Sequence, residues 1–88
     1  MTKVFTLDVY VLLHSGASLS SVTPYVANQF EIYPEKLCKP LYVSTPVGES
    51  ILAERVYRYC PIFINHKNTM IDLVELDIID FQVILGMN

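Results

Sequence analysis

The sequence predicts a single, mostly β domain, a small barrel or sandwich of short strands with one short helix. Three observations support this prediction. Of the 88 residues, 52% are hydrophobic and 17% are charged, a balance typical of one compact core. β-Branched and aromatic residues gather in several short runs, and turn residues separate these runs. A domain of this length buries only about 60–65% of the surface of its unfolded chain, so we expect marginal stability as a monomer.

The N-terminal third contains one predicted strand, a loop and one predicted helix. The run Val4 to Leu13 predicts a strand that is buried on both faces and interrupted at Asp8. Small, turn-prone residues at 14–18 then predict a loop. Thr23 and Pro24 have the residue types of a helix N-cap and first helical position, and we expect this helix to end before Pro34. Its apolar face is predicted to consist of Val22, Tyr25, Val26 and Phe30.

The remaining extended runs predict two hairpins and a last strand, because turn residues lie between the paired runs. The last strand, 81–86, is expected to be buried. The first hairpin joins 41–45 to 50–59 through 46–49, and the second joins 62–64 to 69–76 through 65–68.

Charge and hydropathy exclude several classes of function. Six Lys and Arg stand against nine Asp and Glu, a net charge of −3, and the basic residues are scattered, so no nucleic-acid partner is expected. The longest uncharged stretch, 9–30, is too polar to span a membrane. Asp8 interrupts the first apolar run, so no signal peptide is recognisable. We therefore expect a soluble, intracellular (cytoplasmic) protein.

The cysteines and histidines do not predict a metal site. Cys38 and Cys60 lack the close spacing that seeds a zinc site, even with His14 and His66 included. We expect two free, buried thiols and no metal.

Three segments carry a resemblance to a known family. Residues 11–17 (VLLHSGA) resemble the apolar strand and the Asp-Ser/Thr-Gly-Ala loop of retropepsin-like aspartic proteases. Residues 84–86 (ILG) resemble their second signature, and 44–50 fall where the substrate-covering flap would be. The amino-acid sequences of 44–56 and 74–87 are most similar to the protease region of plant gypsy-type retrotransposon polyproteins.

The resemblance implies a small closed barrel of the retropepsin type and a single domain over residues 1–88. It also implies an endopeptidase that processes its own gag-pol polyprotein as a symmetric homodimer, with no metal and no organic cofactor. Relatives continue beyond the position of Asn88 with a short helix and an interface strand, so we expect weakened dimerisation. The resemblance assigns the active-site loop to His14, Ser15 and Gly16, the flap to Pro46, Val47, Gly48 and Glu49, and the second signature to Ile84, Leu85 and Gly86.

The sequence departs from the family at the residue that performs the chemistry. In these proteases two aspartates, one from each protomer, share a proton and activate a water. His14 occupies the position of that aspartate, and an imidazole provides no anionic oxygen pair, so we predict a catalytically inactive chain. No other carboxylate is expected to substitute, since Asp8 is too far along the strand and Asp72, Asp77 and Asp80 are interpreted as strand-end or loop charges.

Two alternatives stay open. The domain could be a noncatalytic module that holds an extended peptide in the flap-covered groove by strand addition. His14 could instead be a single change in an otherwise active protease, which His14→Asp would revive. Hydrolytic pairs of His14 with Ser15, or of Cys60 with His66, are disfavoured because no third group orients the histidine and no thiolate-stabilising surroundings are evident.

Overall fold

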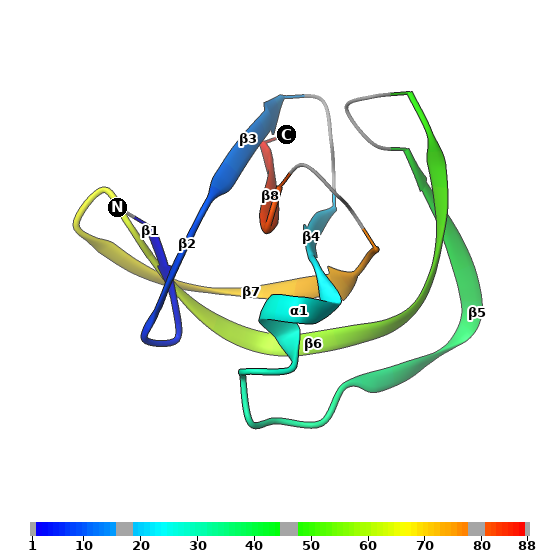
Figure 1. The fold of residues 1–88 in the computed structure, drawn as a ribbon, viewed down its shortest axis with the longest axis horizontal. Coiled ribbons are helices and arrows are strands. Elements are labelled where there is room, and N and C mark those ends of the chain that lie inside the picture. The colour runs from blue at the N-terminus through cyan, green and yellow to red at the C-terminus, as the bar shows by residue number, and fades with distance from the viewer. Residues whose placement is uncertain (1, 16–18, 45–47, 78–80, 88) are drawn as a thin grey trace.

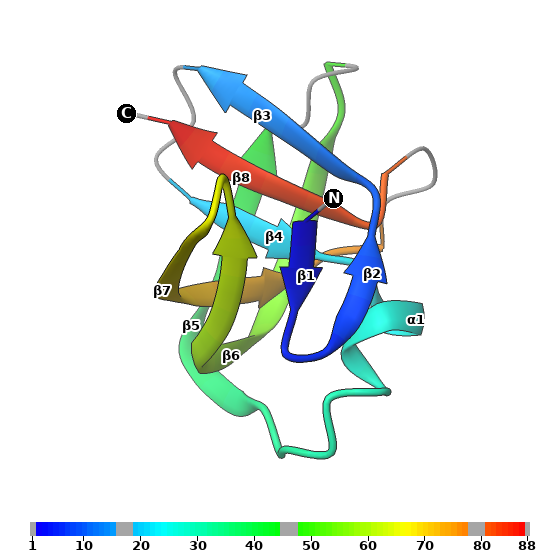
Figure 2. The same cartoon turned by 90° about the vertical axis from the view of Figure 1, so that its left-hand side faces the viewer.

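The chain forms one eight-stranded sheet that curls into a nearly closed barrel, with one short helix packed on it (Figures 1 and 2). The computed structural model describes residues 2–15, 19–44, 48–77 and 81–87. Its elements are β1 (Thr2–Val4), β2 (Leu7–Val9), β3 (Val11–Ser15), β4 (Ser20–Val22), α1 (Pro24–Ala27), β5 (Glu35–Ser44), β6 (Ser50–Ile64), β7 (Lys67–Glu75) and β8 (Val83–Met87).

The strand order explains the barrel shape. The order is β2-β1-β6-β7-β4-β8-β3, and β5 pairs with β6 outside this path. The two end strands, β2 and β3, follow each other in the chain with only Tyr10 between them, so the two edges of the sheet come together. The mostly β barrel predicted from the sequence is therefore confirmed.

The predicted strand from Val4 to Leu13 is wrong in its extent and burial. The chain turns back at Phe5 and Thr6, so β1 and β2 form a hairpin, and β3 follows as a separate strand. Phe5 adopts a φ of 55°, a left-handed conformation that a non-glycine residue seldom takes, so the apolar run gave no sign of this turn. The run is not buried on both faces either, because Leu13 is 48% exposed.

The helix begins at Pro24 as predicted but has only four residues. Val22, Val26 and Phe30 are buried, as expected from the apolar face. Tyr25 is wrongly assigned to that face, since it is 74% exposed. A single turn is too short for helical periodicity to define a face.

Both predicted hairpins are present, although their strands are longer than expected. β5 and β6 pair antiparallel, as do β6 and β7. The run 62–64 belongs to β6, which continues through Pro61 without interruption. The second turn contains only Asn65 and His66, whose φ values of 52° and 62° are those of a tight two-residue hairpin turn. Residue 45 of the first hairpin lies outside the described residues.

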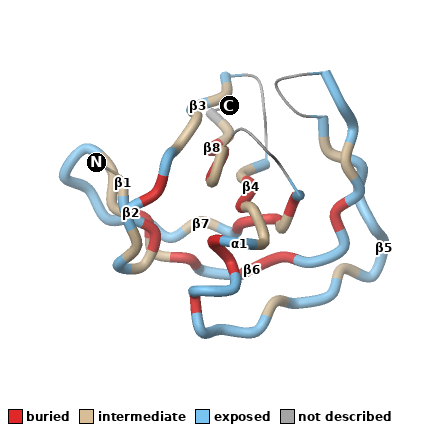
Figure 3. The backbone as a smooth tube through the Cα atoms, in the orientation of Figure 1, coloured by how far each residue is buried: buried red, intermediate tan, exposed pale blue. Residues whose placement is uncertain are grey.

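The core consists of two apolar clusters, and Figure 3 shows β5 running almost fully exposed outside them. The larger cluster packs α1 against the barrel strands, with an aromatic contact between Phe30 and Tyr57 (ring centroids 5.5 Å apart). The smaller one lies where the β5–β6 hairpin meets the end of β7; it consists of Ala53, Val56, Val74 and Leu76, with Leu37, Val43 and Ile51 packed against it.

The two cysteines differ in their surroundings. Both are free thiols, as predicted, but only Cys60 is buried and Cys38 is exposed on β5. The expectation of two buried thiols is therefore wrong for Cys38. Most side chains of β5 are exposed, and among the described strands β5 pairs with β6 alone.

Candidate active-site region

The two segments that resemble the family signatures are neighbouring strands. β3 and β8 pair in parallel, with Leu12 opposite Ile84, Leu13 opposite Leu85 and His14 opposite Gly86. Val83, Ile84 and Leu85 are buried, in agreement with the predicted buried strand. The structure therefore brings residues 12–15 of the N-terminal part beside residues 84–87 at the other end of the chain.

A further strand fixes β8 from its other side. Ser21 of β4 lies opposite Ile84, and the Gly86 amide donates a hydrogen bond of 3.1 Å to the Ser20 hydroxyl oxygen. The neighbouring Ser21 is 2% exposed. No role for Ser20 was predicted from the sequence, because serines are common in loops and nothing in the stretch 18–21 marks this one.

The other end of the β3–β8 pair is held by Gln82. The Tyr10 amide donates to Gln82 Oε1 at 2.8 Å, and the Val83 amide donates to the Tyr10 carbonyl oxygen at 3.1 Å. The Gln82 carbonyl also accepts a hydrogen bond from the Thr23 amide at 2.9 Å. Gln82 thus joins β3, β8 and the start of α1, a positioning role that the sequence analysis did not identify.

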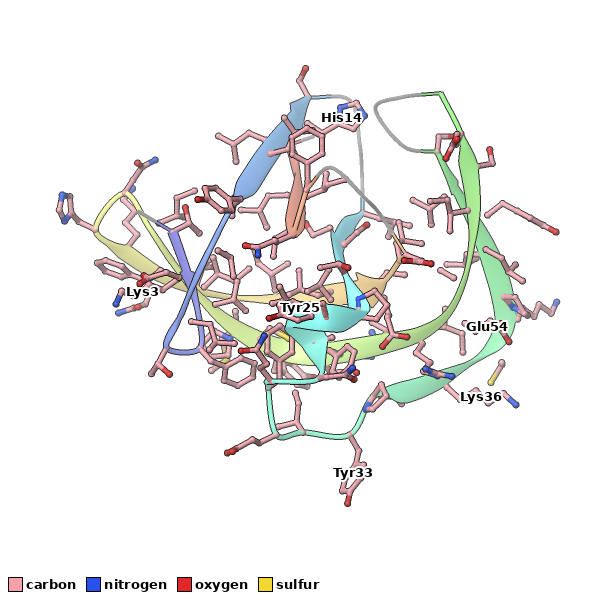
Figure 4. The ribbon with its side chains drawn as sticks, viewed as in Figure 1. Lys3, His14, Tyr25, Tyr33, Lys36 and Glu54 are labelled. Atoms are coloured by element: carbon pink, nitrogen blue, oxygen red, sulfur yellow. The ribbon has the colours of Figure 1, made fainter. Side chains whose placement is uncertain are left out.

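His14 stands near the end of β3 with a half-buried imidazole, which Figure 4 shows directed toward the side of the β5–β6 hairpin. Among the residues that the structure describes, this imidazole has no hydrogen-bond partner. Ser15 is exposed, and Gly16 lies outside the described residues. A neutral imidazole offers one donor and one acceptor nitrogen and no carboxylate oxygen, so His14 cannot supply half of a proton-sharing carboxylate pair.

The carboxylates that we considered as substitutes are engaged elsewhere or exposed. Asp8 forms an ion pair with Lys3 (3.5 Å) in the β1–β2 hairpin. Asp72 lies within β7, not at a strand end as expected, and binds Arg58 (2.9 Å) and the Tyr59 amide (3.0 Å). Asp77 is exposed, and residue 80 lies outside the described residues.

The described residues of the segment interpreted as the flap, 44 and 48–50, lie at the open end of the β5–β6 ladder. Ser44 pairs with Ser50 at the end of the ladder, and Gly48 has a φ of 88°. An added Cβ at Gly48 would meet nothing within 4 Å, so glycine is favoured there by backbone conformation and not by space. Glu49 is exposed, whereas residues 46 and 47, Pro and Val, lie outside the described part. The hairpin and β3 end on the same side of the molecule in both views (Figures 1 and 2).

The alternative hydrolytic pairs receive no support. Cys60 is fully buried, and desolvation raises the pKa of its thiol to about 11, which suppresses the thiolate that a nucleophile requires. His66 lies in the exposed β6–β7 turn with its ring edge-on to Phe63. His14 and Ser15 are consecutive in a strand, so their side chains point to opposite faces.

A network of charges crosses the adjacent strands β5, β6 and β7. Arg58 of β6 binds Glu35 of β5 at 3.3 Å and Asp72 of β7 at 2.9 Å. The Tyr59 amide and the Arg58 guanidinium lower the pKa of Asp72, while the hydrogen bond to Asp72 and the charge of Glu35 raise the pKa of Arg58.

A second network lies three residues further along β7 and centres on Glu75. Its carboxylate accepts hydrogen bonds from Arg55 Nη1 at 3.0 Å and from the Tyr57 hydroxyl at 3.1 Å. Burial, followed by the hydrogen bond to Glu75, raises the pKa of Tyr57. Glu75 was not singled out in the sequence, because contacts across strands depend on a register that the sequence does not display.

No cluster of three or more potential metal ligands is formed by the described His, Cys, Asp and Glu residues. The single described helix is too short to cross a lipid bilayer.

A small, nearly closed β barrel in which a glycine-containing strand pairs with an apolar strand, beside a long hairpin, is consistent with a domain of the aspartic-protease type. The comparison with protein families agrees: residues 1–88 match the family described as "Retroviral aspartyl protease". The protein therefore belongs to the retroviral aspartyl protease family. No curated protein gives a significant match to the chain.

Proposed function

We propose that this protein is a catalytically silent member of its family, derived from the protease region of a plant gypsy-type retrotransposon polyprotein. The active-site loop is assigned to His14, Ser15 and Gly16, and the second signature to 84–86. One observation supports this assignment above the others: His14 lies directly opposite Gly86 in the β3–β8 ladder. The residue that replaces the family aspartate thus occupies a strand position beside the second signature.

The proposed silence follows from the chemistry of the imidazole. In the family reaction one carboxylate removes a proton from water, and a second protonates the developing oxyanion. This reaction requires two carboxyl groups that share one proton. A histidine presents a single nitrogen toward any given partner and is bulkier than a carboxylate. Asp8 and Asp72, which form ion pairs elsewhere, are not available to replace the missing oxygens.

The proposed assembly is a symmetric homodimer that receives an extended segment of a polyprotein, as the family membership suggests. The β5–β6 hairpin serves as the flap, and the flap residues are assigned to Pro46, Val47, Gly48 and Glu49. The unpaired outer edge of β3 among the described strands leaves the His14 region accessible to a partner. No metal or organic cofactor takes part in this proposal.

A second candidate function, peptide binding without cleavage, is favoured by a hollow beside the hairpin. A cavity of about 140 Å³ lies between the hairpin, the start of α1 and the end of β7; it is lined by Ile51, Leu52, Glu54, Arg55, Pro24, Glu75 and Asp77. Pockets for whole small ligands are about 300–1,000 Å³, so this one fits a single side chain of an extended peptide. Peptide binding by the unaltered protein without turnover would distinguish this function from protease activity.

The deciding experiment compares the protein with its His14→Asp variant on a pool of unstructured peptides. We expect no cleavage by the unaltered chain, and pepstatin-sensitive cleavage by the variant at concentrations where sedimentation detects a dimer. Ser15→Ala in the His14→Asp background is the matched control, and it should slow that cleavage. Pepstatin-sensitive cleavage by the unaltered protein would disprove the silence, and a dimeric, folded but inert His14→Asp variant would disprove the site assignment.

A further inference from the structure

The β5–β6 hairpin leaves the barrel at one definable point. The ladder between β6 and β7 runs from Ile64 opposite Lys67 to Val56 opposite Val74. Toward the tip, residues 50–53 of β6 pair only with β5. Figure 1 shows this distal half curving away from β7. Motion of the hairpin relative to the barrel must therefore bend the chain near Val56.

Glu75 connects the two sides of this point. Its carboxylate binds Arg55, on the hairpin side of Val56, and Tyr57, on the barrel side. Tyr57 is 3% exposed and packs edge-on against Phe30, so its hydroxyl is a fixed point of the core. The carboxylate thereby links a solvent-exposed arginine of the hairpin to an immobile phenol.

The opposite face of the hairpin base is held by apolar contacts and by the exposed ion pairs of Arg58 with Glu35 and Asp72. Val56 points to the smaller cluster, on the other side of the strand from Arg55 and Tyr57. Apolar contacts have no preferred direction, whereas hydrogen bonds weaken steeply when their angles change. The cluster therefore permits the hairpin to rock, and the two hydrogen bonds to Glu75 select one orientation. The Glu75 side chain is only 14% exposed, so water competes weakly for its oxygens.

We propose that Glu75 is a positioning residue that sets the orientation of the β5–β6 hairpin over the peptide groove. The role in peptide binding depends on the function proposed above, whereas the anchoring of the hairpin does not. Loss of either hydrogen bond allows the hairpin to open more often, and peptide binding weakens because the open population must close again before it binds.

The first test measures native-state hydrogen exchange in the absence of peptide. Three variants are compared with the unaltered protein: Glu75→Gln removes the charge, Tyr57→Phe removes one hydrogen bond, and Glu54→Gln removes an exposed charge from the same strand as a matched control. We expect Glu75→Gln to speed exchange of the amides at 41–44 and 50–53 about tenfold, the effect of losing a hydrogen bond to a charged group. Tyr57→Phe should have a smaller effect in the same direction, and Glu54→Gln should have none.

Amides of β3 and β8 report whether the effect is local. They should exchange at the same rate in all four proteins if Glu75 acts on the hairpin alone. Equal acceleration of β3, β8 and hairpin amides would reveal general destabilisation and overturn the proposal, as would unchanged hairpin exchange. If Glu75→Gln does not fold, Tyr57→Phe retains the carboxylate and gives the same decision.

The second test separates the two proposals by titrating an unstructured peptide that binds the unaltered protein. We expect the dissociation constant to rise several-fold in Glu75→Gln and to stay unchanged in Lys39→Gln, which removes an exposed charge of β5 that does not line the hollow. If no peptide from the pool binds but Glu75→Gln speeds amide exchange in the hairpin, peptide binding is refuted and the anchoring of the hairpin by Glu75 is supported. If a peptide binds equally well to all variants and exchange is also unchanged, the anchor alone is refuted.

Discussion

The buried thiol of Cys60 makes a prediction that can be worked out from the structure. Its pKa rises from 9.0 to about 11 because the folded chain removes it from water. At pH 8 about 10% of an ordinary thiol is ionised but only about 0.1% of a thiol with that raised pKa, so the reactive thiolate is about 100-fold scarcer. Cys60 is also 0% exposed, so a reagent must wait for the strand to open. Alkylation of Cys60 should thus be slower than that of Cys38 by more than this factor.

The assay uses two single-thiol variants, Cys38→Ser and Cys60→Ser, treated with iodoacetamide at pH 8 and followed by mass spectrometry. We expect the thiol retained in Cys60→Ser to react at the rate of a free peptide, since Cys38 is exposed. The thiol retained in Cys38→Ser should react at that rate only in denaturant. Full-rate alkylation of Cys60 in the folded Cys38→Ser variant would refute both the burial and the raised pKa.

The same pKa fixes the sign of a pH effect on stability. Between pH 9.0 and about 11 the unfolded chain loses the Cys60 proton while the folded chain keeps it, so the free energy of unfolding falls as pH rises. The slope is at most about 1.4 kcal/mol per pH unit. Below pH 9 this contribution is fully present. Tyr57, whose pKa is also raised, acts in the same direction at higher pH, so the difference between the unaltered protein and Cys60→Ser isolates the thiol.

Three other predictions concern stability and are read from urea unfolding. Leu73→Ala should lower the free energy of unfolding by about 2–5 kcal/mol because Leu73 is 0% exposed in the centre of β7, and a loss below 1 kcal/mol would contradict its place in the core. His66→Gly should raise the free energy of unfolding by about 0.5 kcal/mol, because glycine adopts the φ of 62° without strain. The substitution also removes the edge-on contact with Phe63, so a decrease would show that this contact outweighs the relief of strain. Asp72→Asn should make the free energy of unfolding less dependent on pH in acid. The lowered pKa of Asp72 stabilises the folded protein above about pH 4, and this stabilisation is lost as pH falls through the pKa of the folded state. The loss is less than about 1 kcal/mol because the side chain is 44% exposed. An unchanged dependence on pH in acid would exclude that contribution.

Short-range signals accounted for what was predicted correctly. Pro and Gly near residue 48, and Asn and His near residue 66, locate the two hairpin turns, and Thr23 with Pro24 locates the helix start. These features depend on a few adjacent residues, whose backbone preferences operate locally. The mostly β class follows from the same signals.

The errors arose where distant contacts override local preference. Phe5 adopts a left-handed backbone conformation at the turn, and no glycine or asparagine at that position indicated a turn in the sequence. β4 was not predicted because Ser20 and Ser21 are not typical strand residues, yet they pair with β7 and β8. The ion pairs of Glu75 and Asp72 depend on the register between β6 and β7, which the sequence does not display.

The candidate site was predicted from the family resemblance and not from local sequence patterns. The pairing of β3 with β8 could not be derived from periodicity, because two parallel strands at opposite ends of a chain share no local pattern. It was anticipated only through the resemblance of 11–17 and 84–86 to known signatures. Ser20 and Gln82, which hold this pair, carry no such signature.

The hydrogen bond from Tyr10 to Gln82 joins residues 72 positions apart, and it has a consequence for biosynthesis. At roughly 5–20 residues per second, a ribosome needs about 4–14 s to travel between these two codons. Throughout that interval β3 lacks both its partner strand β8 and the hydrogen bond from Tyr10 to Gln82. Whatever the His14 region binds, it acquires the means to do so only after the ribosome has passed the codon of Gln82.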